Sequence, residues 1–192
     1  YFPSNYNCIV ILGPTAVGKT GVGVGVADYY SGQIISADSR QVYKGLDIGS
    51  GKDLDEYILD KGKSTERKIP YHLIDNADVK DEYNVFNYQK DFYKIFSELQ
   101  SKNILPVIVG GTGMYLDSIV RGYDLVEVPT NQELRKSLAG KNEIELTQIL
   151  SELKIKAGSK LHNSTDITER HRLLRAIEIE VFTQEKKSNP EL

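Results

Sequence analysis

The chain has 192 residues, of which 27% are charged and 40% hydrophobic, and its formal net charge at pH 7 is −3. This composition excludes a disordered chain, and the lack of any apolar run near ~18 residues excludes a transmembrane helix. The weak negative charge gives no general attraction to nucleic acid, so any RNA binding must come from a local basic face. Cys8 is the single cysteine and is expected to be a small buried hydrophobe. With no signal-peptide pattern at the N-terminus, these features predict a cytoplasmic protein.

The first predicted element is a buried strand over residues 8–12, which leads into a glycine-rich loop. Glycines in such a loop let successive backbone N–H groups turn toward an anion, while Lys19 adds a positive charge and Thr20 can hold Mg²⁺. The pattern predicts a phosphate or diphosphate site; the alternative is a tight turn beside a surface lysine. The loop matches G-x-x-x-x-G-K-[ST] at every fixed position, and its residues are Gly13, Pro14, Thr15, Ala16, Val17, Gly18, Lys19 and Thr20.

A helix is expected next over residues 20–30, although its three glycines are poor helix formers. A second strand follows over 33–37, and residues 38–43 then lie at its carboxyl end, where open α/β sheets place their ligands. Residues 44–68 are rich in Gly, Lys, Asp and Glu, which predicts a mobile loop. The second glycine–lysine string in this loop, 49–52, is not interpreted as a second phosphate site.

Further along, the pattern predicts a short strand-like run over 69–75, a helix over 84–100 capped by Asn84, and a buried strand over 105–109. A second glycine turn opens a helix that ends near Gly122. Strand–loop–helix units repeated in this way predict an α/β fold, a P-loop NTPase-like parallel sheet flanked by helices. After Pro129 the pattern becomes helical, with helices from residue 131, over 142–153 and over 166–182. We therefore expect an α/β body over 1–129 and a helical insertion lobe over 130–185.

Six segments together carry a resemblance to a known family, and they are 13–20, 34–43, 46–50, 70–75, 109–115 and 170–178. Over residues 8–182 the chain resembles the tRNA dimethylallyltransferase (isopentenyltransferase) family. The resemblance implies that a dimethylallyl group moves from dimethylallyl diphosphate to N6 of the adenosine just 3′ of the anticodon in tRNA. Diphosphate would leave with the help of Mg²⁺, and we expect a monomer. The chain differs from the family in its glycine–valine run after the P-loop. It also ends before the family's last helices and strands, so we expect the C-terminal remainder of the body to be absent.

The resemblance also implies roles for individual residues. Asp38 would be the general base, Thr112 would lie near the reacting centre, and Lys19 would act on the leaving diphosphate held by residues 13–20, with Mg²⁺ on Thr20. Residues implied to contact tRNA are Asp38, Ser39, Arg40, Gln41, Arg135, His171, Arg172, Leu173, Leu174 and Arg175. Without the resemblance, Asp38 could equally stabilise its loop, Thr112 could cap a helix, and residues 171–175 could be a solvated helix face. His72 and His162 lack metal-ligand spacing to one another and are expected to be structural.

Three other functions stay open on the sequence alone. A small-molecule kinase using ATP is compatible with the P-loop, but it has no evident need for residues 38–41 or for the helix at 170–175. An adenine-nucleotide isopentenyltransferase would share the chemistry, but the helical lobe favours tRNA as the acceptor. A catalytically silent nucleotide- or RNA-binding module is disfavoured by the presence of Lys19, Thr20, Asp38 and Thr112 together.

Overall fold

The computed structural model describes residues 6–158 and 169–188, and the chain divides into two compact units at the boundary between Leu125 and Val126. Within those ranges, every helix is too short or too polar to span a membrane.

The first unit is built on a four-stranded sheet in the order β1-β6-β2-β5, in which all paired strands are parallel. The bounds of these strands are Ile9–Leu12 for β1, Pro106–Gly110 for β6, Gln33–Ala37 for β2 and Tyr71–His72 for β5. The central strand β6 pairs on both sides, so that Val107 lies opposite both Ile9 and Ile34. The buried runs of small and β-branched residues are typical of parallel strands that are covered on both faces.

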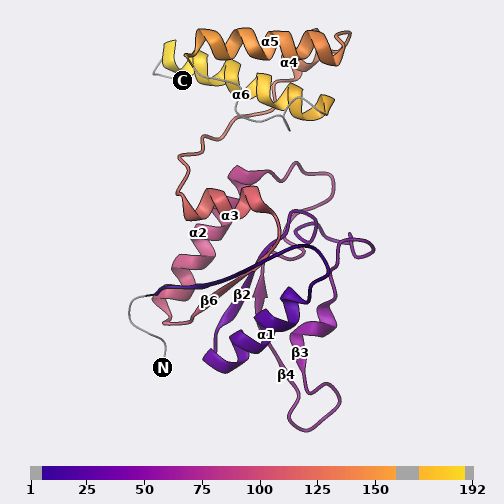
Figure 1. The fold of residues 1–192 in the computed structure, drawn as a ribbon, viewed down its shortest axis with the longest axis vertical. Helices are drawn as coiled ribbons and strands as arrows, with labels where there is room; N and C mark the ends of the chain where they lie inside the picture. Colours follow the sequence, from indigo (N-terminus) through magenta and orange to yellow (C-terminus); the bar gives the residue numbers. More distant parts are fainter. Residues whose placement is uncertain (1–5, 159–168, 189–192) are drawn as a thin grey trace. The chain divides into compact units, whose positions relative to one another are not determined.

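Helices cover both faces of this sheet (Figure 1). Helix α1, Lys19–Tyr30, contributes Val24 to the same apolar cluster as Val107, whereas helix α2, Val85–Ser101, contributes Phe92 to a second cluster with the next strand residue, Ile108. Successive side chains of a strand point to opposite faces, so these two clusters lie on opposite sides of the sheet. Helix α3, Gly113–Val120, joins α2 on its face. The predicted α/β fold, a parallel sheet flanked by helices, is confirmed. Asn84 also caps α2 as predicted, because its side chain accepts hydrogen bonds from two backbone N–H groups.

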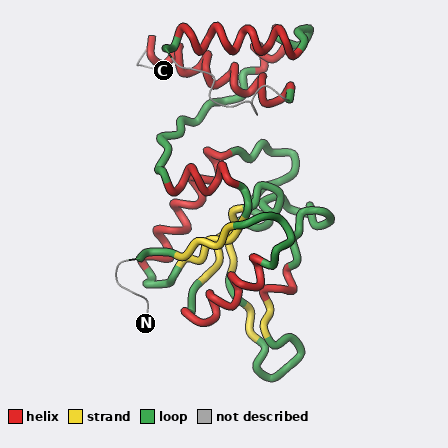
Figure 2. The backbone as a smooth tube through the Cα atoms, viewed as in Figure 1, coloured by secondary structure: helices red, strands yellow, loops and turns green. Residues whose placement is uncertain are grey.

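Residues 54–68, expected to be part of a mobile loop, contain regular elements that the sequence pattern did not predict. A short 3₁₀ helix η1, Leu54–Tyr57, is followed by an antiparallel hairpin whose strands β3 and β4 are Ile58–Leu59 and Arg67–Lys68 (Figure 2). Tyr57 is only 4% exposed and belongs to the core under α1. The Arg67 guanidinium donates two hydrogen bonds to the Asp28 carboxylate, at 2.7 and 2.6 Å, which connects the hairpin to α1.

The second unit contains three helices among its described residues. They are α4, Gln132–Ser137, α5, Glu143–Lys156, and α6, Arg170–Ser188. Asn131 and Asn142 cap α4 and α5 through their side-chain oxygens, which explains the predicted starting points. Helices α5 and α6 extend beyond their predicted ends at 153 and 182, while residues 166–168 lie outside the described ranges. The core of the unit consists of Leu138, Leu146, Leu150, Leu173 and Ile177.

Candidate active site

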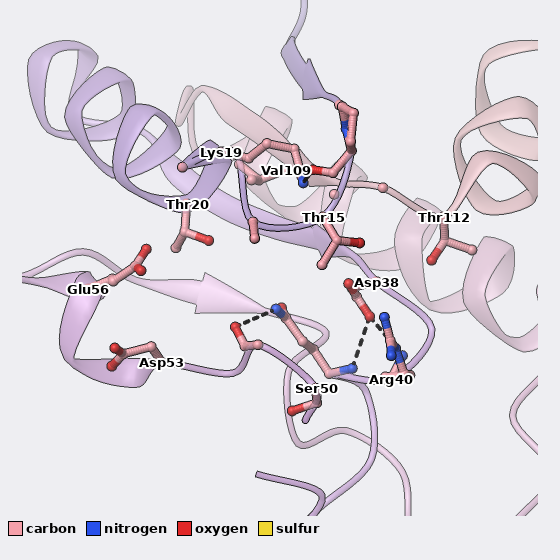
Figure 3. Close-up of a pocket in the computed structure, with 18 of the residues that line it drawn as sticks. Thr15, Lys19, Thr20, Asp38, Arg40, Ser50, Asp53, Glu56, Val109 and Thr112 are labelled. Atoms are coloured by element: carbon pink, nitrogen blue, oxygen red, sulfur yellow. Dashed lines mark hydrogen bonds between the residues drawn. The ribbon is translucent and has the colours of Figure 1, made fainter. Parts of the chain in front are cut away.

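Three neighbouring strands end at one edge of the sheet, and a predicted site segment follows each of them. The P-loop follows β1, residues 110–112 end and follow β6, and residues 38–41 follow β2. Because these strands are adjacent and parallel, their carboxyl ends bring the three segments together, as is usual for ligand sites in α/β sheets. All three line a single cavity of about 410 Å³ (Figure 3).

The P-loop lines one side of this cavity. Ala16 and Gly18 have positive φ values of 63° and 79°, and such left-handed residues turn successive N–H groups toward one side. Helix α1 begins directly after Gly18, so its N-terminus, which favours negative charge, opens onto the same cavity. Lys19 Nζ donates a hydrogen bond to the Pro14 carbonyl, which keeps the ammonium over the loop. Thr20 lines the cavity beside it.

Asp38 occupies the turn after β2. Its Oδ1 accepts hydrogen bonds from the backbone N–H groups of Arg40 at 2.9 Å and of Gln41 at 3.3 Å. Asp38 therefore does stabilise its own loop, as one interpretation of the sequence held. Figure 3 shows that its other carboxylate oxygen is turned toward Thr15 of the P-loop. A carboxylate held by one oxygen can still accept a proton at the other, so the two roles are compatible.

Thr112 lies at the N-cap position of α3, but its hydroxyl makes no capping bond there. Instead, Thr112 Oγ1 accepts a hydrogen bond from Ser39 N at 3.0 Å and donates one to Ser39 Oγ at 3.3 Å. These bonds connect the end of β6 to the turn that carries Asp38. Gly110 makes this approach possible, because a Cβ at that position would lie 2.2 Å from the carbonyl oxygen of Ala37.

The fourth side of the cavity is formed by residues 50–56, which we call the wall segment; this part of the site was missed from the sequence. Ser50, Asp53 and Glu56 of this segment line the cavity opposite the P-loop, and Figure 3 shows Glu56 facing Thr20. Gln41, predicted to read a base, connects to the segment: its Oε1 accepts from Ser36 Oγ and its Nε2 donates to Gly51 O, both at 3.1 Å. Asp53, which caps η1 through Asp55 N, is a helix-start signal that could have been recognised.

Two buried tyrosines lie near Asp38. Burial raises the pKa of Tyr57, and the nearby charges of Glu56, Tyr71 and Asp38 raise it further. Burial also raises the pKa of Tyr115, with smaller contributions from Tyr43 and Asp38. Both phenols therefore stay neutral around the carboxylate. His72, expected to be structural, lies away from the cavity lining, where its Nε2 is 2.7 Å from Gln33 Oε1; His162 lies outside the described residues.

In the helical unit, the predicted tRNA-contacting residues separate into two groups. The side chains of His171 and Arg172 are 76% and 44% exposed, and each lies near Glu169. Leu173 is fully buried and Leu174 is partly buried beside it in the core of the unit, so contact of these two residues with tRNA stays a prediction that rests on the resemblance. Cys8, expected to be buried, is only partly buried, and that burial raises the pKa of its thiol.

Arg135 and Arg175 form an internal ion-pair network with Glu178, whose side chain is 1% exposed. The Glu178 carboxylate accepts from Arg135 Nε at 2.6 Å and from Arg175 Nη1 at 3.1 Å, while Arg175 Nη2 donates to Val128 O at 2.8 Å. Burial works against the charge of Glu178, but the hydrogen bonds from the two arginines outweigh it and lower its pKa. Both arginines therefore stabilise the unit from within.

Comparison with known proteins assigns the family. The sequence profile of the IPP transferase family matches residues 41–191. The chain belongs to the IPP transferase family. Among curated members of this family, it is 48% identical over 186 residues to tRNA dimethylallyltransferase 2 of Treponema denticola and 51% identical over 174 residues to tRNA dimethylallyltransferase 1 of Geotalea daltonii. It covers 57% and 52% of those two proteins, while 97% and 91% of this chain is matched. The chain thus spans about half the length of the curated relatives it matches.

Solved structures of IPP transferases agree with the fold. The crystal structure of the tRNA isopentenylpyrophosphate transferase from Bacillus halodurans aligns with a TM-score of 0.55 at 32% identity, over 93% of this chain and 56% of that one. A eukaryotic dimethylallyltransferase acting on tRNA aligns with a TM-score of 0.61 at 23% identity, over 93% of this chain and 44% of that one, which supports the fold alone.

Proposed function

We propose that this IPP transferase moves a dimethylallyl group from dimethylallyl diphosphate to the N6 amine of the adenosine 3′-adjacent to the anticodon in tRNA. The observation that carries the proposal is one cavity with a P-loop on one side and the Asp38 turn on the other. Such a cavity offers anion-binding groups for a leaving diphosphate and a proton acceptor for an attacking amine. The curated relatives described above are tRNA dimethylallyltransferases, which supports this assignment.

The P-loop serves the leaving group. Negative charge grows on the diphosphate as its bond to the dimethylallyl carbon breaks, and fixed N–H groups aimed at that position stabilise the developing charge. The left-handed residues Ala16 and Gly18 orient those N–H groups. Lys19, whose ammonium lies over the loop at Pro14, adds a full positive charge at the same place.

The Asp38 turn serves the acceptor. As the nitrogen lone pair forms the new N–C bond, N6 must lose a proton, and we assign Asp38 as the base that accepts it. Thr112, through its two hydrogen bonds to Ser39, holds this turn at the end of β6. Thr112 is therefore a positioning residue for the base in this proposal. The electron pair of the broken C–O bond leaves with the diphosphate, so the transfer needs no other reactant.

The residues of the cavity fit a bound Mg²⁺ ion. Mg²⁺ in proteins takes oxygen ligands and is usually held by one or two carboxylates together with substrate phosphates and water. The Thr20 hydroxyl and the carboxylates of Asp53 and Glu56 line the same cavity and provide such oxygens. When bound there, Mg²⁺ would neutralise part of the diphosphate charge.

We propose that residues 130–185 form the tRNA-binding lobe and that the exposed side chains of His171 and Arg172 contact RNA. Arg40, exposed at the cavity, would contact the RNA that enters it. The target adenosine must leave the base stack to reach the donor, as in other enzymes that modify a base. Arg135 and Arg175 support this lobe through Glu178. We further propose that the enzyme acts as a monomer, and in the cytoplasm.

The test uses the protein in its full natural length with unmodified tRNA, Mg²⁺ and dimethylallyl diphosphate labelled in the dimethylallyl group. A parallel reaction contains the same labelled donor with ATP and AMP in place of tRNA. We expect label in the tRNA at the adenosine beside the anticodon, and no consumption of ATP. Consumption of ATP without label transfer would instead identify a kinase. Label on a free adenine nucleotide but not on tRNA would identify an adenine-nucleotide isopentenyltransferase.

A further inference from the structure

Lys52 is a buried lysine that the proposed mechanism does not use. Its side chain is 1% exposed, although it belongs to a segment of the chain that is otherwise rich in exposed polar residues. The ammonium has three donors, and each has an acceptor: Asp75 Oδ1 at 2.6 Å, Tyr43 O at 2.8 Å and Asp47 Oδ1 at 3.1 Å. Burial opposes the charge of Lys52, but the bonds to Asp75 and Asp47 outweigh it and raise its pKa.

Two of these acceptors, Asp75 and Tyr43, belong to two stretches of chain that are hydrogen-bonded to one another next to the Asp38 turn. Asp75 N donates to Gln41 O at 3.1 Å, and Lys44 N donates to Ala77 O at 2.9 Å, so residues 41–44 and 75–77 run side by side. Tyr43 lies in this pair and bridges to Ala77. We call residues 41–44 and 75–77 the platform. Lys52 therefore attaches the chain around it to the platform, which follows the turn of Asp38, the proposed base.

The wall segment, residues 50–56, begins at this attachment. Gly51, next to Lys52, is bonded to Gln41 from the platform side, and Tyr57 at the far end is buried in the core. Between these two points the segment presents Asp53 and Glu56 to the cavity, where Figure 3 shows Glu56 facing Thr20. The orientation of these carboxylates relative to the P-loop is thus set by the bonds of Gly51 and Lys52 at one end and by Tyr57 at the other.

We infer that Lys52 is a positioning residue whose buried ammonium fixes the wall segment against the P-loop, so that Mg²⁺-dependent binding of diphosphate requires it. The inference rests on the proposed function, because it takes the cavity as the diphosphate site. Neither Lys52 nor the three residues that accept hydrogen bonds from its ammonium line the cavity, so the effect of the ammonium acts through Asp53 and Glu56. Diphosphate binding that depends only on P-loop contacts should not need it.

The test measures binding of inorganic diphosphate by calorimetry, with Mg²⁺ and with a chelator, for the parent protein and for Lys52→Met. Methionine keeps the length of the side chain but removes its charge and donors. We expect the Kd with Mg²⁺ to rise about 10- to 100-fold, the range seen when groups that orient metal ligands are removed. The Kd without Mg²⁺ should equal that of the parent. Lys102→Met, which removes an exposed lysine paired with Glu98 on α2, is the matched control and should change neither value.

Hydrogen exchange provides a second measurement on the same proteins. In Lys52→Met, amides of residues 44–56 should exchange faster, while those of the central strands β2 and β6 keep the parent rates. If Lys52→Met fails to fold, Asp75→Asn decides the matter, because it weakens only the shortest of the three contacts and should raise the same Kd by a smaller factor.

The outcomes separate the two claims. A parent protein that binds no diphosphate under either condition would refute the proposed site itself. A parent that binds it, with Lys52→Met or Asp75→Asn binding equally well in Mg²⁺, would refute the role of Lys52 and leave the site standing. An equal loss with and without Mg²⁺ would also refute the inference, because Lys52 would then support the whole cavity rather than the wall segment.

Discussion

The glycine–valine run of α1 allows a sharp test of how the P-loop helix packs on the sheet. Gly23 and Gly25 lie two residues apart in the same helix, yet their surroundings differ. A Cβ added at Gly23 would lie 2.5 Å from Val109 Cγ2, whereas a Cβ at Gly25 would meet nothing within 4 Å. Only the first of these glycines is therefore required by packing, and the second costs helix stability without an evident structural return.

The expected magnitudes follow from two effects. Replacing a glycine by alanine inside a helix stabilises it by about 1 kcal/mol at either position. At Gly23 the new methyl group must also displace Val109, a β-branched residue that has little rotamer freedom, and overpacking of this kind costs about 1–3 kcal/mol. Gly25→Ala should therefore raise the free energy of unfolding by about 1 kcal/mol, and Gly23→Ala should change it from about zero to a loss of about 2 kcal/mol.

The assay is equilibrium urea denaturation followed by circular dichroism, with the m-value checked for constancy so that midpoints can be compared. In the presence of Val109→Ala, Gly23→Ala should lose most of its overpacking cost, since the Val109 methyl group that meets the new Cβ is gone. A double-mutant cycle should therefore give a favourable interaction energy between the two substitutions. Equal stabilisation by Gly23→Ala and Gly25→Ala would show that α1 does not approach β6 as closely as described here.

Three further predictions concern charged residues of the site and of the helical unit. Lys19→Met should lower turnover about 100-fold or more in the label-transfer assay, because it removes a charge that stabilises the leaving diphosphate; unchanged turnover would contradict its role. Glu178→Gln should destabilise the helical unit by about 1–3 kcal/mol in urea, because Arg135 and Arg175, which are partly exposed, lose the charged acceptor of their hydrogen bonds. Since the pKa of Glu178 is lowered in the folded state, its contribution should be complete at neutral pH and be lost as the pH falls below about 4.3 through the folded value; equal stability at pH 3 and pH 7 would contradict this. Arg172→Ala should reduce the slope of the salt dependence of tRNA binding by about 1 and leave stability unchanged, whereas Arg175→Ala should mainly lower the stability of the helical unit; the opposite pattern would show that the two side chains have been assigned the wrong way round.

Local signals explain why much of the fold could be predicted. Residues 105–109 are a continuous apolar run, residues 33–37 are largely apolar, and both form strands within one residue of the expected limits. Asn84, Asn131 and Asn142 stand directly before helical patterns, and each accepts a capping hydrogen bond from the backbone. Such features depend on neighbours in the sequence, so the sequence alone reveals them.

The hairpin and the wall segment could not be predicted because they depend on distant partners. Strand β4 is only Arg67–Lys68, and Arg67 is held by Asp28, 39 positions away. Lys52 appears as part of a polar glycine-rich string, and its burial depends on Asp75, 23 positions away. No hydrophobic periodicity within residues 44–68 indicates either contact.

Within the site, motifs located the segments but not the bonds between side chains. The P-loop, Asp38 and Thr112 were expected near one another, and they line one cavity. Thr112 bonds to Ser39, across 73 positions, and makes no side-chain cap on α3, which was the alternative interpretation of this residue. In helix α6 the basic residues lie at adjacent positions around the helix, so the sequence did not distinguish the exposed Arg172 from Arg175, which faces Glu178. That distinction required the packing of α6 against its neighbours.

The central claim is that Asp38 accepts the amine proton while the P-loop holds the departing diphosphate. A single-turnover measurement tests it most directly. The enzyme is present at a concentration above its Kd values for tRNA and for labelled dimethylallyl diphosphate, and transfer of the label is followed for the parent and for Asp38→Asn. Asparagine can still accept the bonds from the backbone of Arg40 and Gln41, so donor binding should stay near the parent value. We expect the transfer rate to fall about 10²- to 10⁴-fold. A transfer rate equal to that of the parent would contradict the assignment of Asp38 as the base.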